Sequence, residues 1–98
     1  MTRVEIAPEV ANDFDRIIAH LLEHSVDDAP SRIEAIIRAI DVLERNPLIG
    51  RRVRGATREL IIGRHSGGYV ALYRYIPEID TVFVLAVRSQ LEAGHARS

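Results

Sequence analysis

The segment from Arg58 to Arg88 most constrains the fold of this chain. It contains three apolar runs, two of them rich in β-branched and aromatic residues, with turn-forming residues between each pair. The runs cover residues 60–62, 69–76 and 81–87, and the turns between them cover residues 65–68 and 77–80. Such runs, separated by Gly, Pro and Asp, predict strands joined by short hairpins. Three strands in sequence predict an antiparallel meander.

Two amphipathic helices are predicted before this meander. A short alternating strand over residues 3–7 is followed by Pro8, which suits the first turn of a helix. Residues 25–30 break the helical pattern, and Pro47 ends the second helix at Asn46. The hairpin 8–46 is expected to bury one stripe on the sheet, formed by Phe14, Ile17, Leu21, Ile33, Ile37 and Ile40. The predicted fold class is α+β, with the order βααβββ and a mainly antiparallel sheet.

Length and composition limit the remaining possibilities. A chain of 98 residues with 47% hydrophobic residues predicts one globular domain over 1–98. No apolar run approaches the ~18 residues of a membrane span. The acidic N-terminus lacks a signal-peptide core and there is no cysteine, so we expect a cytoplasmic protein without disulfides. The polar segment 89–98 is expected to be a flexible tail.

Charge is distributed unevenly along the chain. Residues 1–49 contain ten acids and five arginines, a balance of −5, while residues 50–98 contain four acids and eight arginines, a balance of +4; together they give the net charge of −1. All thirteen basic residues are arginine. Arginine binds carboxylates and phosphates in bidentate fashion but does not shuttle protons. The arginine-rich segment 47–57 also contains Gly and Pro, which predicts a basic loop.

Two apparent motifs have simpler explanations. The H-x-x-E-H pattern from His20 to His24 resembles that of inverted zinc peptidases, but both histidines fall near the polar face of the first helix. Solvated surface histidines are the favoured interpretation. The glycine-rich segment 63–68 lacks the Lys-Ser/Thr ending of a phosphate loop and lies between strands, so a hairpin turn that includes His65 is favoured. No metal or cofactor is predicted.

Two arginines of the meander are harder to explain by packing alone. Arg74 alternates in phase with Val70, Leu72 and Ile76, and Arg88 ends the last strand. Both side chains could simply extend their charged ends to the margin of the sheet. Alternatively, they form a basic surface that receives an acidic peptide or nucleic-acid phosphates.

The order of elements and several short fragments resemble the RelE/ParE superfamily of bacterial toxins. The fragments are Asn46-Pro47-Leu48-Ile49-Gly50-Arg51, Arg58-Glu59-Leu60, Gly68-Tyr69-Val70-Ala71-Leu72-Tyr73-Arg74 and Leu85-Ala86-Val87-Arg88. The resemblance extends from Val4 to about Glu92. It implies a type II toxin that forms a hetero-oligomer with a cognate, ParD-like antitoxin, whose disordered C-terminal segment wraps around the toxin.

The superfamily contains two activities, so the resemblance leaves alternatives open. RelE-like members are ribosome-dependent mRNA endoribonucleases, whereas ParE-like members inhibit DNA gyrase without acting as enzymes. RelE-like sequences typically have an arginine where this chain has Val70, and Gln90 lies near the place of a second catalytic basic residue. These departures favour the ParE-like branch, known for plasmid stabilisation, with gyrase as the target. A nuclease would depend on Arg88, His65 or His95, and a degenerate toxin would only bind its antitoxin.

The resemblance and the charge distribution together identify candidate binding residues. Contacts with the antitoxin or the target are assigned to Arg58, Arg64, Tyr73, Arg74 and Arg88. The arginines are expected to bind carboxylates of an acidic segment, and Tyr73 is expected to serve as an apolar anchor.

Overall fold

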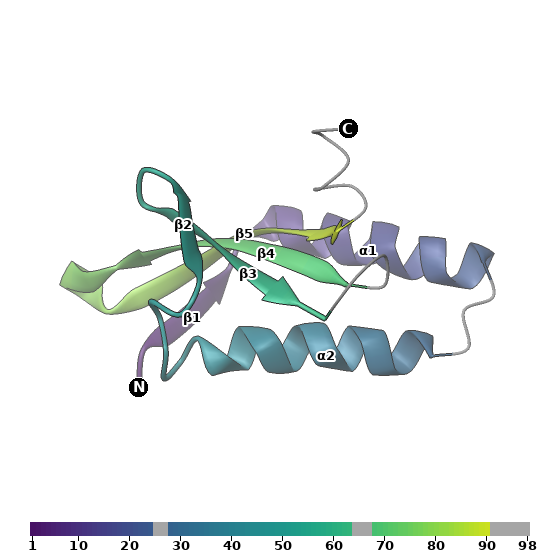
Figure 1. Cartoon of the computed structure of the whole chain (residues 1–98), viewed down its shortest axis with the longest axis horizontal. Helices are drawn as coiled ribbons and strands as arrows, with labels where there is room; N and C mark the ends of the chain where they lie inside the picture. Colours follow the sequence, from purple (N-terminus) through teal and green to yellow (C-terminus); the bar gives the residue numbers. More distant parts are fainter. Residues whose placement is uncertain (25–27, 64–67, 91–98) are drawn as a thin grey trace.

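The computed structural model describes residues 1–24, 28–63 and 68–90 of the chain. The elements, shown in Figure 1, are β1 (Arg3–Ile6), α1 (Pro8–Glu23), α2 (Ala29–Val42), β2 (Arg51–Arg54), β3 (Thr57–Ile62), β4 (Tyr69–Ile76) and β5 (Thr81–Ser89). A 3₁₀ turn, Pro77–Ile79, connects β4 to β5. Among these residues no helix combines the length and the apolar character needed to cross a membrane. The α+β class is confirmed, with two helices packed on one sheet.

The strands form a single mixed sheet in the order β1-β5-β4-β3-β2. β3, β4 and β5 pair antiparallel, which confirms the predicted meander. β1 lies parallel to β5, with Arg3 opposite Thr81. β5 continues to Ser89, the first residue of the predicted tail, and residues 91–98 of that prediction lie outside the described residues.

The prediction of a loop over residues 47–57 is wrong for Arg51–Arg54, which forms β2. This strand pairs antiparallel with β3 through a turn at Gly55, whose φ of +54° favours glycine. All four β2 residues are exposed at the edge of the sheet. An edge strand at the surface needs no alternating apolar face, and this sequence, Arg-Arg-Val-Arg, therefore has little of the pattern that identifies a strand.

The core lies between the helices and one face of the sheet. Its buried members are Val10, Ile17, Leu21, Ile36, Ile40, Leu43, Ile62, Tyr69, Ala71, Tyr73, Val82, Val84 and Val87. The alternation of β4 places Tyr69, Ala71 and Tyr73 on this face.

Ile37 does not belong to the core, contrary to the predicted stripe. Its side chain is 50% exposed, whereas Ile36 is fully buried. The apolar residues of α2 cover more than one line along the helix, so periodicity alone does not decide which line faces the sheet. Ile36, Ile40 and Leu43 take that position, and Ile37 is left at the gap between the helices.

Asp13 is a buried carboxylate in the middle of the apolar stripe of α1. Its Oδ2 accepts a hydrogen bond of 2.9 Å from the amide of Val87, and its Oδ1 accepts one of 3.2 Å from Arg16. The β4–β5 register shifts between Leu72 and Tyr73, close to this point. Since buried polar groups need partners, Asp13 satisfies a backbone amide beside this irregularity and ties α1 to β5.

The N-terminus is attached to the β4–β5 turn through Asp80. The Thr2 hydroxyl and the Tyr75 hydroxyl each donate a hydrogen bond of 2.7 Å to Asp80 Oδ1. These bonds, first from Thr2 and then from Tyr75, hold the pKa of Asp80 below its ordinary value of 3.8. The Tyr75 hydroxyl, donating to this carboxylate, has a pKa raised above 10.0.

We expect Asp80→Asn to reduce the free energy of unfolding by an amount that depends on pH. The ionised Asp80 carboxylate stabilises the folded state above pH 3.8, and this stabilisation is lost as pH falls through the lowered pKa that Asp80 has in the folded protein. The protonated Tyr75 hydroxyl stabilises the folded state below pH 10.0, and this stabilisation is lost as pH rises through the raised pKa that Tyr75 has in the folded protein. Urea unfolding at several pH values should therefore show the largest difference from wild type between these limits. Asp15→Asn, on the exposed side of α1, is the control. A difference for Asp80→Asn that is the same at pH 3 and pH 7 would contradict this assignment.

Candidate functional site

One face of the sheet is not covered by the helices, and we call it the open face. The register brings together Ile61, Val70 and Arg88 in one row and Glu59, Leu72 and Ala86 in the next. A third row contains Thr57, Arg74 and Phe83. Ile61 is 55% exposed, and Leu85, beside the register shift, is 37% exposed. The open face thus has an arginine near each end and exposed apolar atoms at Ile61 and Leu85, while Val70 and Ala86 are buried.

Arg74 and Arg88 both lie on this face with exposed side chains. Arg88 is opposite Val70, four residues along β4 from Arg74, so the two arginines start roughly 13 Å apart at 3.3 Å per residue. Within the described part of the chain, neither has an ion-pair partner. Two free guanidinium groups at this spacing can each bind one carboxylate of an extended peptide, or one phosphate of a nucleic acid.

Arg58 and Tyr73, two of the predicted binding residues, make contacts within the fold that the sequence did not indicate. Arg58 lies on the helix side of β3, where its Nη1 donates to the carbonyls of Gly50 at 2.7 Å and Leu48 at 3.2 Å. Tyr73 is fully buried, and its hydroxyl accepts a hydrogen bond of 2.8 Å from the Gly50 amide. Both side chains therefore hold the loop before β2 against the sheet, and Tyr73 has no surface to offer a partner.

Gly50 is the residue that permits this arrangement. A Cβ built at this position would lie 2.7 Å from the Tyr73 hydroxyl and 2.8 Å from the Glu59 carbonyl, closer than real Cβ contacts. A larger residue would displace the tyrosine or the loop, and so move the start of β2.

Three further predicted residues, Arg64, His65 and His95, lie outside the described residues. Gln90, noted for its place at the end of the last strand, has a local role. Its backbone N–H donates to the Gly68 carbonyl at 2.9 Å, and its side-chain Nε2 donates to the Gly63 carbonyl at 3.3 Å. Gln90 thus connects the two ends of the β3–β4 turn to the end of β5.

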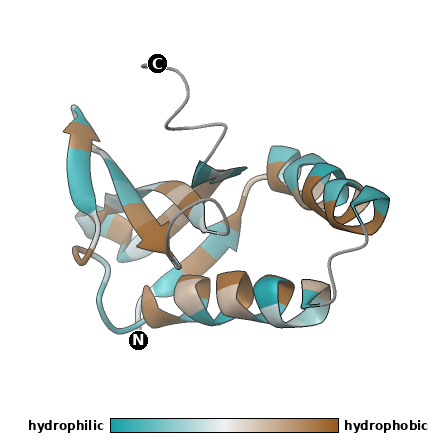
Figure 2. Ribbon diagram, turned by 45° about the vertical axis from the view of Figure 1, so that its right-hand side comes forward, coloured by the Kyte–Doolittle hydropathy of each residue, from teal (hydrophilic) through white to brown (hydrophobic). Residues whose placement is uncertain are grey.

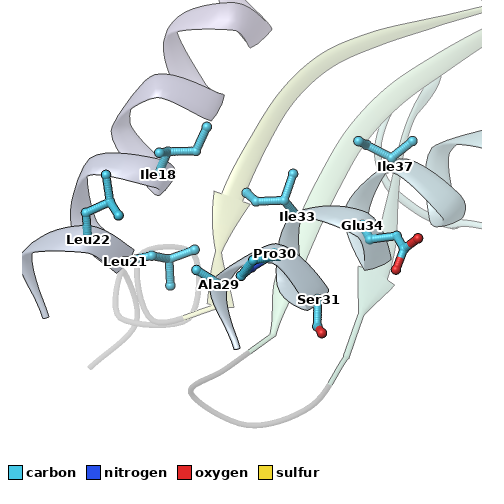
Figure 3. Close-up of a pocket in the computed structure, with 9 residues that line it drawn as sticks. All are labelled: Ile18, Leu21, Leu22, Ala29, Pro30, Ser31, Ile33, Glu34 and Ile37. Carbon is cyan, nitrogen blue, oxygen red and sulfur yellow. The ribbon is translucent and has the colours of Figure 1, made fainter. Parts of the chain in front are cut away.

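A second candidate surface is an apolar groove of about 780 Å³ between α1 and α2 (Figure 3). It is lined by Ile18, Leu21, Leu22, Ala29, Pro30, Ser31, Ile33, Glu34 and Ile37. Leu22 is 71% exposed there. Ile37 lines this groove, although the sequence analysis assigned it to the core. His20 near the end of α1 and His24 just after it do not line the groove, and their ring centroids are 4.2 Å apart.

The chain is similar to known toxins over most of its length. Residues 4–94 match the family model described as ParE toxin of type II toxin-antitoxin system, parDE. Toxin RelE3 of Caulobacter vibrioides is 30% identical over 92 residues, which are 94% of this chain and 98% of that protein.

Solved structures share the fold. The crystal structure of the toxin-antitoxin complex RelBE2 from Mycobacterium tuberculosis matches with a TM-score of 0.56 and 24% identity, over 90% of this chain and 96% of that chain. The intact E. coli RelBE complex matches with a TM-score of 0.59 and 18% identity, over 91% of this chain and 96% of that chain. The chain therefore belongs to the ParE toxin family, within the RelE/ParE superfamily of type II toxin–antitoxin systems.

Proposed function

We propose that this toxin inhibits DNA gyrase by binding, without acting as an enzyme, and that a cognate antitoxin neutralises it. The observation that carries the proposal is the chemistry of the open face. Arg74 and Arg88 provide fixed positive charge, and Val70 lies between β3 and Arg88 in the position where RelE-like sequences typically have an arginine. Such a surface favours binding over catalysis.

Metal-free RNA cleavage needs a base that accepts the 2′-hydroxyl proton as well as cations that bind the phosphate. Arginine supplies only the cation. On the described open face the carboxylates are Glu59, which forms an ion pair with Arg51, and Glu5, which lies 3.6 Å from Arg3. Of the described histidines, His20 is on α1 and His24 directly follows the end of that helix. The groups gathered on the described part of this face therefore suit a binding surface.

A ribosome-dependent endoribonuclease is the second candidate. The names of the similar proteins support it, since the Caulobacter relative is a RelE3 toxin and the two similar complexes are RelBE complexes. In that case Arg88 would bind the phosphate, and His65 or His95 would be the base.

The antitoxin is proposed to cover the open face. Two of the similar structures are toxin–antitoxin complexes, which supports a partner of this kind for the chain. An acidic segment with apolar residues at alternate positions complements Arg74, Arg88 and the aliphatic residues between them. A segment that is disordered alone would fold on this surface and bury on the order of 1,000–3,000 Å².

The two activities are distinguished by expressing the toxin without its antitoxin. Gyrase inhibition predicts filamentous cells, an induced DNA-damage response and intact messages. A nuclease predicts arrested translation and messages with new ends, and this result would contradict the proposal. The same gene with an early stop codon is the control for expression, and restored growth on co-expression of the antitoxin tests neutralisation. Normal growth without the antitoxin would favour a degenerate toxin.

A further inference from the structure

The end of α1 has two histidines one helical turn apart, His20 in its last turn and His24 at its C-cap. We propose that this pair is a two-histidine chelate for a divalent transition-metal ion of the Cu²⁺ or Ni²⁺ type. The proposed function does not use either residue, and α1 covers the face of the sheet opposite the open face (Figure 1). The inference therefore stands independently of the antitoxin and of gyrase.

The spacing of the two histidines brings their rings together at the surface. Residues four apart on a helix lie on the same side, and at this spacing two imidazoles can bind one ion. Both side chains are exposed, and their ring centroids are 4.2 Å apart, with the ring planes inclined by 36°. Figure 2 shows α1 coloured hydrophilic along one side and hydrophobic along the other. Solvated surface histidines, as the sequence indicates, are also the ones that an ion reaches directly from solvent.

A hydrogen bond determines which nitrogen of His24 can bind the ion. Its Nδ1 lies 2.9 Å from the carbonyl oxygen of His20. Because a carbonyl oxygen only accepts hydrogen bonds, Nδ1 of the neutral ring has the proton and Nε2 has the free lone pair. Metal-binding histidines commonly donate their other ring N–H in this way. The His20 ring has no hydrogen-bond partner within the described part of the chain, so it can turn about χ2 to meet the ion.

The distance between the rings indicates the kind of ion. A metal–nitrogen bond of roughly 2.1 Å places the ion about 3.2 Å from the centroid of each bound imidazole. Two rings bound at a right angle then have centroids about 4.5 Å apart, and two rings bound at the tetrahedral angle about 5.2 Å apart. The observed 4.2 Å is closer to the right angle. Square-planar and octahedral coordination, with right angles between ligands, is typical of Cu²⁺ and Ni²⁺.

The site is open to solvent. Among the described residues no group of three or more potential ligands is present, so water completes the coordination of the ion. A zinc peptidase centre needs a third protein ligand, and the pair is therefore a binding site without catalysis. Leu21 and Leu22, between the two histidines, line the groove of Figure 3. A bound ion would thus stabilise the last turn of α1 and one wall of this groove.

The test titrates the purified, untagged toxin with NiCl₂ in a calorimeter. We expect one Ni²⁺ per chain. His20→Gln and His24→Gln should each weaken binding about tenfold or more, because the second ligand of a chelate binds at high effective concentration. The double variant His65→Gln, His95→Gln removes the other two histidines of the chain and should keep the affinity within about twofold of wild type.

Thermal unfolding gives a second measure of binding. Without metal, it checks that each variant is folded. With Ni²⁺, the melting temperature should rise for the wild type and for the double variant His65→Gln, His95→Gln, because the ion binds the folded state. It should not rise for the double variant His20→Gln, His24→Gln. Nitrogen-15 chemical shifts of the ring nitrogens, measured without metal, should place the His24 proton on Nδ1.

Four results would overturn the proposal. They are equal Ni²⁺ affinity of the wild type and His20→Gln, His24→Gln, loss of binding only in His65→Gln, His95→Gln, a His24 proton on Nε2, and half an ion per chain. The last result would mean that two copies of the chain share the ion. None of these results bears on gyrase inhibition or on neutralisation, because neither gyrase nor an antitoxin takes part in the experiment.

Discussion

Replacing Arg74 and Arg88 together by glutamate is expected to weaken antitoxin binding about 100-fold, or roughly 2.7 kcal/mol. Both side chains are exposed on the open face and lack ion-pair partners among the described residues. An exposed ion pair contributes roughly 0–1 kcal/mol, and reversal replaces each attraction by a repulsion of similar size. Two positions therefore account for an effect of this magnitude. Calorimetry over a salt series measures it, because the loss should shrink as salt screens the charges.

The control for this experiment is the double variant Arg38→Glu, Arg45→Glu. These arginines are exposed on and after α2, so the change in net charge is the same while the open face stays intact. If the control weakens binding as much as Arg74→Glu, Arg88→Glu, long-range charge rather than the open face explains the affinity. If neither variant has an effect, the antitoxin does not use these arginines.

Ile36→Ala should lower the free energy of unfolding by about 2–5 kcal/mol. Ile36 is fully buried in the core, so the truncation removes apolar contacts and leaves a cavity beneath α2. Ile37→Ala is the matched comparison, because it removes the same atoms from the next position on the same helix. With Ile37 half exposed at the groove, we expect a loss below about 1 kcal/mol.

Urea unfolding of the two variants, monitored by circular dichroism, provides the comparison. Equal losses would mean that α2 faces the sheet by a different line of residues than the structure shows. A larger loss for Ile37→Ala would restore the phase predicted from the sequence and remove the groove as an exposed feature.

The meander was predictable because its signals are local. Each strand has its own apolar run, and each hairpin has glycine, proline or aspartate between strands, so no knowledge of distant contacts was needed. β2 gave no such signal, because three of its four residues are arginine. It forms a strand through its pairing with β3, which the local sequence does not reveal. The parallel pairing of β1 with β5 joins residues far apart in the chain, which periodicity cannot specify.

The candidate site was predicted only in part. Alternation placed Arg74 with Val70 and Leu72, and the structure has these residues on the open face. Arg58 and Tyr73 bond to backbone groups of Leu48 and Gly50. These contacts are recognisable only in the folded chain, so the sequence analysis assigned the two residues only to binding.

Asp13 is the residue that the sequence analysis missed although a signal was present. It interrupts the apolar spacing between Val10 and Ile17 on α1, where a charged residue is unusual. Its partner, the Val87 amide, depends on an irregularity in the β4–β5 pairing that no local pattern reveals.

The most direct test of the proposed activity uses the purified toxin with gyrase and supercoiled DNA, and in parallel with ribosomes translating a defined message. If the toxin is a gyrase inhibitor, cleaved DNA trapped on gyrase will accumulate with toxin concentration, and the message will stay intact. The double variant Arg74→Glu, Arg88→Glu, tested in the same assay, will show whether the open face contributes to gyrase inhibition. Cleavage of the message in the ribosomal A site without any increase in cleaved DNA, and its loss in Arg88→Ala or His95→Ala, would show instead that the toxin is a ribonuclease.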